Sequence, residues 1–209
     1  RTSINVHRVR FIVSQLLTLL NEGQLDQYLA IVSKQLRTTS EHFAIRTSMQ
    51  MLRPDLWPRI HEAARLRIEN KLIQDIKSGK TQYSNRTSGA LATWAAEYVK
   101  NFAQRTEAAS VLVAKLAHTD SDERNYVAKY FLPYFPGIFL SEGGVRHAVR
   151  TIATQIRGGD QNVMQALIST IQNYPNEWQS QLAESLKDLT DSENPCLLYT
   201  SPSPRDRTR

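Results

Sequence analysis

The sequence predicts an all-α fold of stacked antiparallel helical hairpins, arranged as a short α-solenoid or an irregular helical bundle. Apolar residues recur at three- and four-residue steps in one segment after another, which is the spacing of one face of an α-helix. Glycine and proline residues fall at the boundaries of these segments. No segment shows the polar and apolar alternation of a half-buried strand. The chain is therefore predicted to be a series of short amphipathic helices.

The first part of the chain is expected to hold four helices and a loop. The first helix is apolar around most of its second half, so we expect it to be well buried and to stop at Gly23. Pro54 ends the third helix, and Pro58 opens the fourth, because proline suits a first helical position. The expected ranges are 4–22, 25–36, 41–53 and 58–79 for the helices and 80–88 for the loop.

The second part is expected to hold six shorter helices. Proline and glycine residues within 133–137 break the chain after the third of them and leave a short apolar piece at 138–140. Two glycines, Gly158 and Gly159, end the fourth helix, and Asp160 opens the fifth. The expected ranges are 90–102, 106–117, 121–132, 145–156, 163–171 and 177–189.

The helix pair within 106–136 carries a resemblance to a known family. Thr106 is a candidate N-cap for its first helix, and Asp120 is one for its second. The acidic turn that begins at Asp120, the Arg124 that follows it and the small and apolar positions after that resemble one unit of a HEAT repeat. Glu123 departs from the pattern, because that family usually has an apolar residue there. The resemblance implies a stacked, non-catalytic scaffold, in which each hairpin needs neighbours to bury its apolar stripes.

A second resemblance concerns the end of the chain. Residues 196–206, CLLYTSPSPRD, resemble the conceptual translation of an adapter used in sequencing libraries. This implies a non-native, disordered tail at 196–209 and a single helical-repeat-like segment of a larger protein at 1–195. The alternative is a natural basic tail rich in proline and serine. The one cysteine, Cys196, belongs to this stretch, and a segment without cysteine suits the reducing cytoplasm, where we expect the protein.

Charge is distributed unevenly along the chain. Residues 1–86 hold 14 Lys or Arg and 7 Asp or Glu, whereas residues 87–195 hold 9 and 12. A basic half suits an acidic partner, such as nucleic acid or an acidic protein surface. The simpler interpretation is solvated helix faces with partners four residues apart, such as Arg65 and Glu69. No apolar run approaches the roughly 18 residues of a membrane span, so no membrane association is expected.

These features favour a non-enzymatic scaffold or protein-interaction segment, in which shape and surface charge select a partner that is expected to be a protein. Arginine and lysine side chains on exposed helix faces can bind phosphates or carboxylates, although a solvated helix face is the preferred explanation of them. A nucleic-acid-binding helical module that acts through the basic half is an alternative. The candidate partner-binding residues are Arg67, Lys71, Arg146, Arg150 and Arg157.

An enzymatic alternative uses Arg37 and His42. Their R-x4-H spacing resembles the active-site motif of the HEPN superfamily of helical ribonucleases. The resemblance implies that the Arg and His of two protomers meet at a dimer cleft, where they polarise a phosphodiester and shuttle a proton. Here the two residues lie on either side of a predicted helix break.

Two further patterns suggest metal ligands and are explained without a metal. His61 and Glu62 resemble the start of a zinc-protease helix, but Arg65 stands where the second histidine is needed. His118, Asp120 and Asp122 alternate along the chain, and a helix-capping turn accounts for them. We therefore expect neither a metal nor a cofactor.

Overall fold

The structure, a computed structural model, describes residues 6–39, 42–78 and 96–191, and all regular structure in these ranges is helical. The prediction of an all-α fold is confirmed. In chain order the α-helices and 3-10 helices are α1 (Val6–Leu19), α2 (Glu22–Thr38), α3 (His42–Gln50), η1 (Pro54–Arg59), α4 (Glu62–Lys77), η2 (Val99–Asn101), α6 (Arg105–Leu116), α7 (Ser121–Tyr130), η3 (Leu132–Tyr134), α8 (Phe135–Ile138), α9 (Glu142–Arg157), α10 (Gln161–Thr170), η4 (Ile171–Asn173) and α11 (Asn176–Asp191). The predicted loop at 80–88 and the tail at 196–209 lie outside the described residues.

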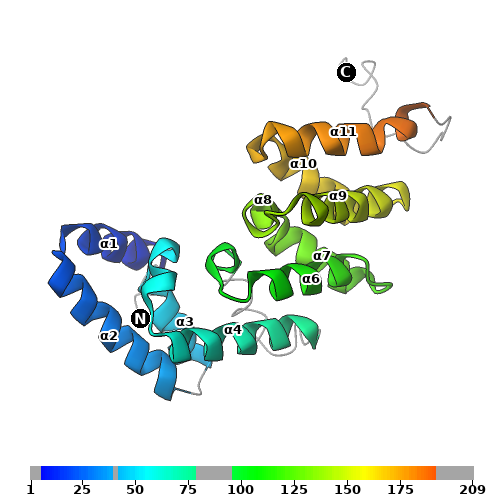
Figure 1. Ribbon diagram of the computed structural model, residues 1–209. Helices are drawn as coiled ribbons and strands as arrows, with labels where there is room; N and C mark the ends of the chain where they lie inside the picture. The colour runs from blue at the N-terminus through cyan, green and yellow to red at the C-terminus, as the bar shows by residue number, and fades with distance from the viewer. Residues whose placement is uncertain (1–5, 40–41, 79–95, 192–209) are drawn as a thin grey trace, which may run out of the picture.

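Four helices lie one on another and form the main layer of the molecule. Figure 1 shows α4, α6, α9 and α11 in a row from the bottom of the view to the top, and each contacts the next. Behind them α7 contacts α10, while α7 also packs on α6 and α10 on α9. The hairpin α6–α7 is therefore stacked on the hairpin α9–α10. At the other end α2 packs on both α3 and α4.

In both stacked hairpins an aspartate at the turn caps the second helix. Asp120 is the N-cap of α7, and its side chain accepts a hydrogen bond from the N–H of Asp122 at 2.8 Å. Asp160 is the N-cap of α10 and accepts from two N–H groups of the first turn, each at 3.1 Å. Both predicted caps are confirmed. In the second turn Gly159 has φ 82°, a conformation that glycine adopts without strain.

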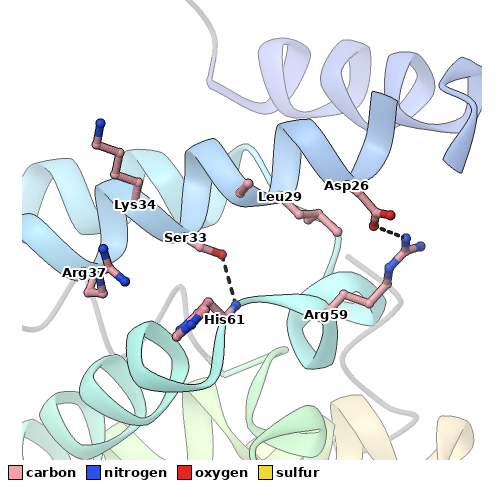
Figure 2. Close-up of a pocket in the computed structure, with 8 residues that line it drawn as sticks. Asp26, Leu29, Ser33, Lys34, Arg37, Arg59 and His61 are labelled. Carbon is pink, nitrogen blue, oxygen red and sulfur yellow. Dashed lines mark hydrogen bonds and ion pairs between the residues drawn. The ribbon is translucent and has the colours of Figure 1, made fainter. Parts of the chain in front are cut away.

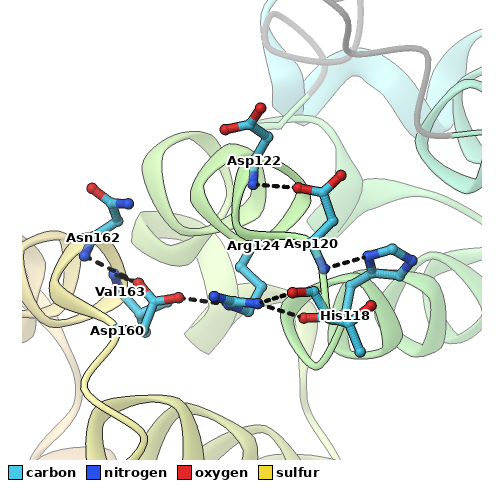
Figure 3. A network of polar contacts seen from close by, with 8 residues as sticks. His118, Asp120, Asp122, Arg124, Asp160, Asn162 and Val163 are labelled. Atoms are coloured by element: carbon cyan, nitrogen blue, oxygen red, sulfur yellow. Dashed lines mark hydrogen bonds and ion pairs between the residues drawn. The ribbon is translucent and has the colours of Figure 1, made fainter.

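Arg124 joins one hairpin to the other. Its Nε donates to Asp160 Oδ2 at 2.6 Å, and its Nη1 donates to the carbonyls of His118 and Thr119, each at 2.8 Å (Figure 3). The guanidinium thus binds the turn of its own hairpin and the helix cap of the next. Because the Arg124 and Asp160 side chains are only 17% and 6% exposed, this ion pair is largely shielded from water.

Glu123 occupies the position at which the HEAT pattern usually has an apolar residue. Its carboxylate lies 3.1 Å from the Lys115 ammonium of α6, and each side chain is 13% exposed. An ion pair between the two helices of the hairpin therefore takes the place of an apolar contact.

Glu69 is a charged residue in the core and is 0% exposed. Its Oε1 accepts from Trp57 Nε1 at 2.8 Å and from the N–H of Ala103 at 3.1 Å, and its Oε2 accepts from the N–H of Gln104 at 3.0 Å. These bonds join η1, α4 and the chain just before α6. Trp57 also lies edge-on to Tyr98, with 5.7 Å between the ring centroids.

The burial predicted for the first helix is wrong. Leu17 is 5% exposed and faces the core, with Val13 and Leu20 partly buried beside it. The opposite side of α1 is also apolar and is open to solvent. Its exposed residues are Phe11 (66%), Ile12 (55%), Leu16 (55%) and Leu19 (78%). We call these four residues the outer stripe of α1.

Several predicted boundaries in the first part are also wrong. Gly23 lies in the first turn of α2, inside the capping box formed by Asn21 and Gln24, rather than ending the first helix. Pro58 lies inside η1, and α4 begins only at Glu62. The chain between Pro54 and α4 therefore forms a separate 3-10 turn.

Further differences occur around the central hairpin. The described end of the helix predicted at 90–102 forms turns and the 3-10 helix η2. Thr106 lies inside α6, whose N-cap is Gln104 without a side-chain hydrogen bond. Pro136 lies within α8 instead of breaking the chain, because proline is tolerated in a first helical turn.

Candidate functional site

A pocket of about 360 Å³ opens between α2 and the segment that joins η1 to α4. Figure 2 shows α2 along one side of it, with η1 and the start of α4 along the other. We call it the α2–α4 pocket. Leu29 and Ala30 supply its apolar lining, and its polar lining residues are Asp26, Ser33, Lys34, Arg37, Arg59 and His61.

Arg59 is held in place at one end of the pocket. Its Nη2 donates to Glu22 Oε2 at 2.7 Å and to Asp26 Oδ1 at 2.8 Å. The hydrogen bonds to Glu22 and then to Asp26 raise the pKa of the Arg59 guanidinium above its ordinary value. Both bonds use one nitrogen, so Nε and Nη1 remain available as donors within the described residues.

His61 and Ser33 lie where α2 and α4 approach each other. The backbone N–H of His61 donates to Ser33 Oγ at 3.0 Å, and His61 Nδ1 accepts from the N–H of Ala63 at 3.3 Å. His61 is thus the N-cap of α4. Because Nδ1 is an acceptor, the proton of the neutral imidazole is on Nε2, which has no acceptor within the described part of the chain. The sequence argues against a zinc site at His61, because Arg65 stands where the second histidine would be needed. In the structure the exposed His61 ring caps α4 instead.

Arg37 and Lys34 are exposed cations on the last turns of α2. Within the described residues neither side chain has a hydrogen bond or an ion pair. In Figure 2 the Arg37 side chain extends toward His61, whereas Lys34 extends away from α4. The pocket therefore presents guanidinium, imidazole and hydroxyl donors to one space. Such an arrangement can bind an anion.

The ribonuclease interpretation depends on Arg37 and His42. Arg37 lies in the last turn of α2 and His42 is the first residue of α3, so a helix break separates them as predicted. The side chain of His42 lies outside the described residues. The histidine next to Arg37 in the pocket is His61. The Arg37 and His42 pair stays a prediction.

The predicted pair Arg67 and Lys71 is not a pair of free cations. Arg67 is half-buried, and its Nη1 donates to the carbonyl of Leu36 at 2.6 Å, where it binds the C-terminal end of α2. Lys71 is half-buried one turn further along α4 and has no hydrogen bond within the described residues. Arg67 therefore contributes to packing between α2 and α4.

The predicted ridge on α9 is also divided. Arg146 pairs with Glu142 one turn before it, and Arg157 donates to the carbonyl of Ser185 in α11. Arg150 is exposed, and its side chain has no partner within the described residues. Of the three arginines, two thus have contacts within the protein.

The alternating residues of the α6–α7 turn form a capping turn, as predicted, to which Asp122 contributes its backbone N–H. His118 Nδ1 accepts from the N–H of Asp120 at 3.1 Å, and the carboxylate of Asp120 caps α7 (Figure 3). Across the described ranges no three His, Cys, Asp or Glu side chains are grouped as metal ligands.

Sequence reasoning missed the α2–α4 pocket and the contact between Arg124 and Asp160. The contact between Arg124 and Asp160 did have a signal in the sequence, because both hairpins place an Asp at the N-cap of their second helix. The second hairpin has Met164 where the first has Arg124, so no repeated Asp-to-Arg spacing marks it. The pocket had no such signal, because α3 lies between its two walls in sequence.

Comparison of the chain with protein-family models, with curated proteins and with solved structures gives no match. Among the described residues no helix is both long and apolar enough to cross a membrane.

Proposed function

We propose that this chain is a non-enzymatic helical scaffold of the HEAT type that binds a protein partner. The stacking of α6–α7 on α9–α10 and the contact between Arg124 and Asp160 support the repeat-like part of the proposal. The outer stripe of α1 is the single observation that supports a binding role, because a large apolar surface in water favours association.

The outer stripe extends over residues 11–19, or more than two turns of helix. Single exposed apolar residues are common on protein surfaces, but four large ones at 55% exposure or more on one side of a helix form a continuous strip. A strip of this shape fits the apolar side of another amphipathic helix.

Charge defines the partner further. The half of the chain that carries the stripe has 14 basic and 7 acidic residues. An amphipathic helix with acidic residues beside its apolar side would therefore be attracted electrostatically as well as by apolar contact. We propose this acidic amphipathic helix of a protein partner as the occupant of the outer stripe.

A designed peptide tests the proposal directly. The peptide is helical, with a leucine stripe between rows of glutamate, and a scrambled peptide of the same composition is the negative control. We expect binding to the designed peptide in fluorescence anisotropy, with affinity at least about tenfold lower in the double variant Leu16→Gln and Leu19→Gln. Ile168→Gln is the matched control, because Ile168 is 67% exposed on α10, and it should bind normally.

Two outcomes would overturn this choice of partner. One is equal affinity for the designed and scrambled peptides, or for the double variant and the wild type. The other is a molecular mass that rises with protein concentration in the absence of peptide, but does not rise in the double variant. A second copy of the chain would then cover the stripe. Unchanged melting temperatures would establish that the variants remain folded.

The two alternative functions have separate tests. A ribonuclease would lose RNA cleavage in His42→Ala while remaining folded. A nucleic-acid-binding module would bind with a steep salt dependence, which charge reversal at Arg67 and Lys71 should weaken. The hydrogen bond from Arg67 to Leu36 supports the scaffold over this second alternative, since it gives Arg67 a role within the fold.

A further inference from the structure

We infer that the α2–α4 pocket binds a phosphate group, carried on a phosphorylated side chain of a protein partner. The inference deepens the proposed function, since it gives the partner a second anchor, but it concerns a surface separate from the outer stripe of α1. It rests on the charges, the donors and the volume of the pocket.

The pocket has a positive charge available for an anion. Lys34, Arg37 and Arg59 supply three cations, and Glu22 and Asp26 supply two carboxylates, both bound to Arg59. Three minus two leaves one positive charge when His61 is neutral. Both carboxylates pair with Arg59 and leave that end of the pocket negative, so the positive charge lies at the other end, on Lys34 and Arg37.

The donors come from several directions. Arg37 offers its planar guanidinium, and His61 offers Nε2 because its Nδ1 already accepts from Ala63. Ser33 is 7% exposed, and its oxygen accepts from the His61 N–H. Its hydroxyl proton has no acceptor among the described residues, so a nearly buried donor remains unpaired beside the pocket.

This arrangement suits a phosphate better than a carboxylate. A phosphate ester has three terminal oxygens that accept hydrogen bonds from different sides, and near neutral pH it carries between one and two negative charges. A carboxylate has two oxygens in one plane and a single charge. Arginine binds phosphate with two parallel hydrogen bonds. A pocket of about 360 Å³ accommodates the end of a phosphorylated side chain.

The test compares three peptides of one sequence, with phosphoserine, glutamate or serine at the central position, and inorganic phosphate as the free source. Binding is followed by NMR of the backbone amides. We expect the phosphopeptide to shift the amides of Ser33, His61 and Ala63 and to bind at least about tenfold more tightly than the other two peptides.

Variants locate the site. Arg37→Gln should weaken phosphopeptide binding at least about tenfold, and because Arg37 is exposed the fold should be unaffected. Ser33→Ala tests the hydroxyl, with melting temperature as the check on folding. Arg105→Gln is the control, since Arg105 lies at the start of α6 outside the pocket and donates to the carbonyl of Lys100, and its affinity should be unchanged.

Each outcome decides the inference. Phosphopeptide binding that Arg37→Gln weakens and Arg105→Gln does not would support it. If inorganic phosphate binds as tightly as the phosphopeptide, the phosphate is not recognised on a protein partner. If both arginine variants lose affinity equally, the phosphate does not bind in the α2–α4 pocket. The double variant Leu16→Gln and Leu19→Gln should leave phosphopeptide binding unchanged, so failure here is distinct from failure of the proposed function.

Discussion

Glu69 holds together the junction between the first helices and the stack. It is completely buried and accepts three hydrogen bonds, from η1 and from the two residues that precede α6. A buried charge is tolerated only when donors surround it. Here the donors come from segments that the carboxylate itself joins, so its removal should affect both.

We therefore predict that Glu69→Gln destabilises the protein by about 2–4 kcal/mol. Glutamine keeps one acceptor oxygen, but its NH₂ group must face at least one N–H, which leaves donors unpaired in the core. Urea unfolding followed by circular dichroism measures the change. Glu107→Gln is the control, because the Glu107 side chain is 48% exposed and pairs with Lys77 at the surface, so its loss should cost no more than about 1 kcal/mol. Equal effects would contradict the role of Glu69.

Residue spacing predicted a solvent-exposed pair between Arg65 and Glu69, and this is wrong. The two residues do lie one turn apart, but Arg65 donates to the carbonyl of Pro58 while Glu69 is buried. Spacing along a helix fixes which residues share a side. Which side is covered depends on η1 and on the chain before α6, and that packing is not encoded in the helix itself.

Among the elements, the two hairpins pack on each other through α7 on α10 and α6 on α9, and the ion pair between Arg124 and Asp160 joins their turns. We predict a coupling energy of about 1–2 kcal/mol in a double-mutant cycle with Arg124→Gln and Asp160→Asn. Asparagine preserves the N-cap of α10, so the cycle isolates the ion pair. Thermal and urea unfolding of the four proteins measure it.

The control cycle uses Glu142→Gln and Arg146→Gln on α9. This pair lies within one helix, with side chains 75% and 55% exposed, and should couple by no more than about 0.5 kcal/mol. If the coupling between Arg124 and Asp160 is equally small, the hairpins are held together by apolar packing alone.

Helix starts marked by aspartate were predictable, whereas glycine and proline gave mixed results. Asp120 and Asp160 cap the helices as expected, because a cap depends on residues next to it in sequence. Gly23 and Pro136 were expected to stop helices and lie in first turns instead. A first turn has N–H groups without helical partners, so either residue is tolerated there, and sequence alone does not separate a stop from a start.

For the whole molecule, the sequence predicted helices correctly but not which apolar sides are covered. The first helix has apolar residues on two sides, and only the side with Leu17 faces the core. Periodicity gives the direction of each side chain relative to its helix. The position of α1 relative to its neighbours, which leaves the outer stripe open, comes from tertiary packing and required the structure.

The stacked layer α4, α6, α9 and α11 raises the question of whether the chain unfolds in parts, as a solenoid does, or all at once, as a closed bundle does. Trp178 allows a test at one end. It is 3% exposed in α11 and packs edge-on against Tyr174, with 5.5 Å between the ring centroids. Trp178→Ala should remove about 3–5 kcal/mol of packing at this end.

In a solenoid that loss remains local, because each helix pair contacts only its neighbours. Hydrogen exchange should then show faster exchange in α9 and α11 and unchanged protection in α2 and α4. Trp57→Ala is the matched variant at the other end, since Trp57 is also fully buried, and it should give the reverse pattern. Faster exchange in every helix after either substitution would show a single cooperative bundle.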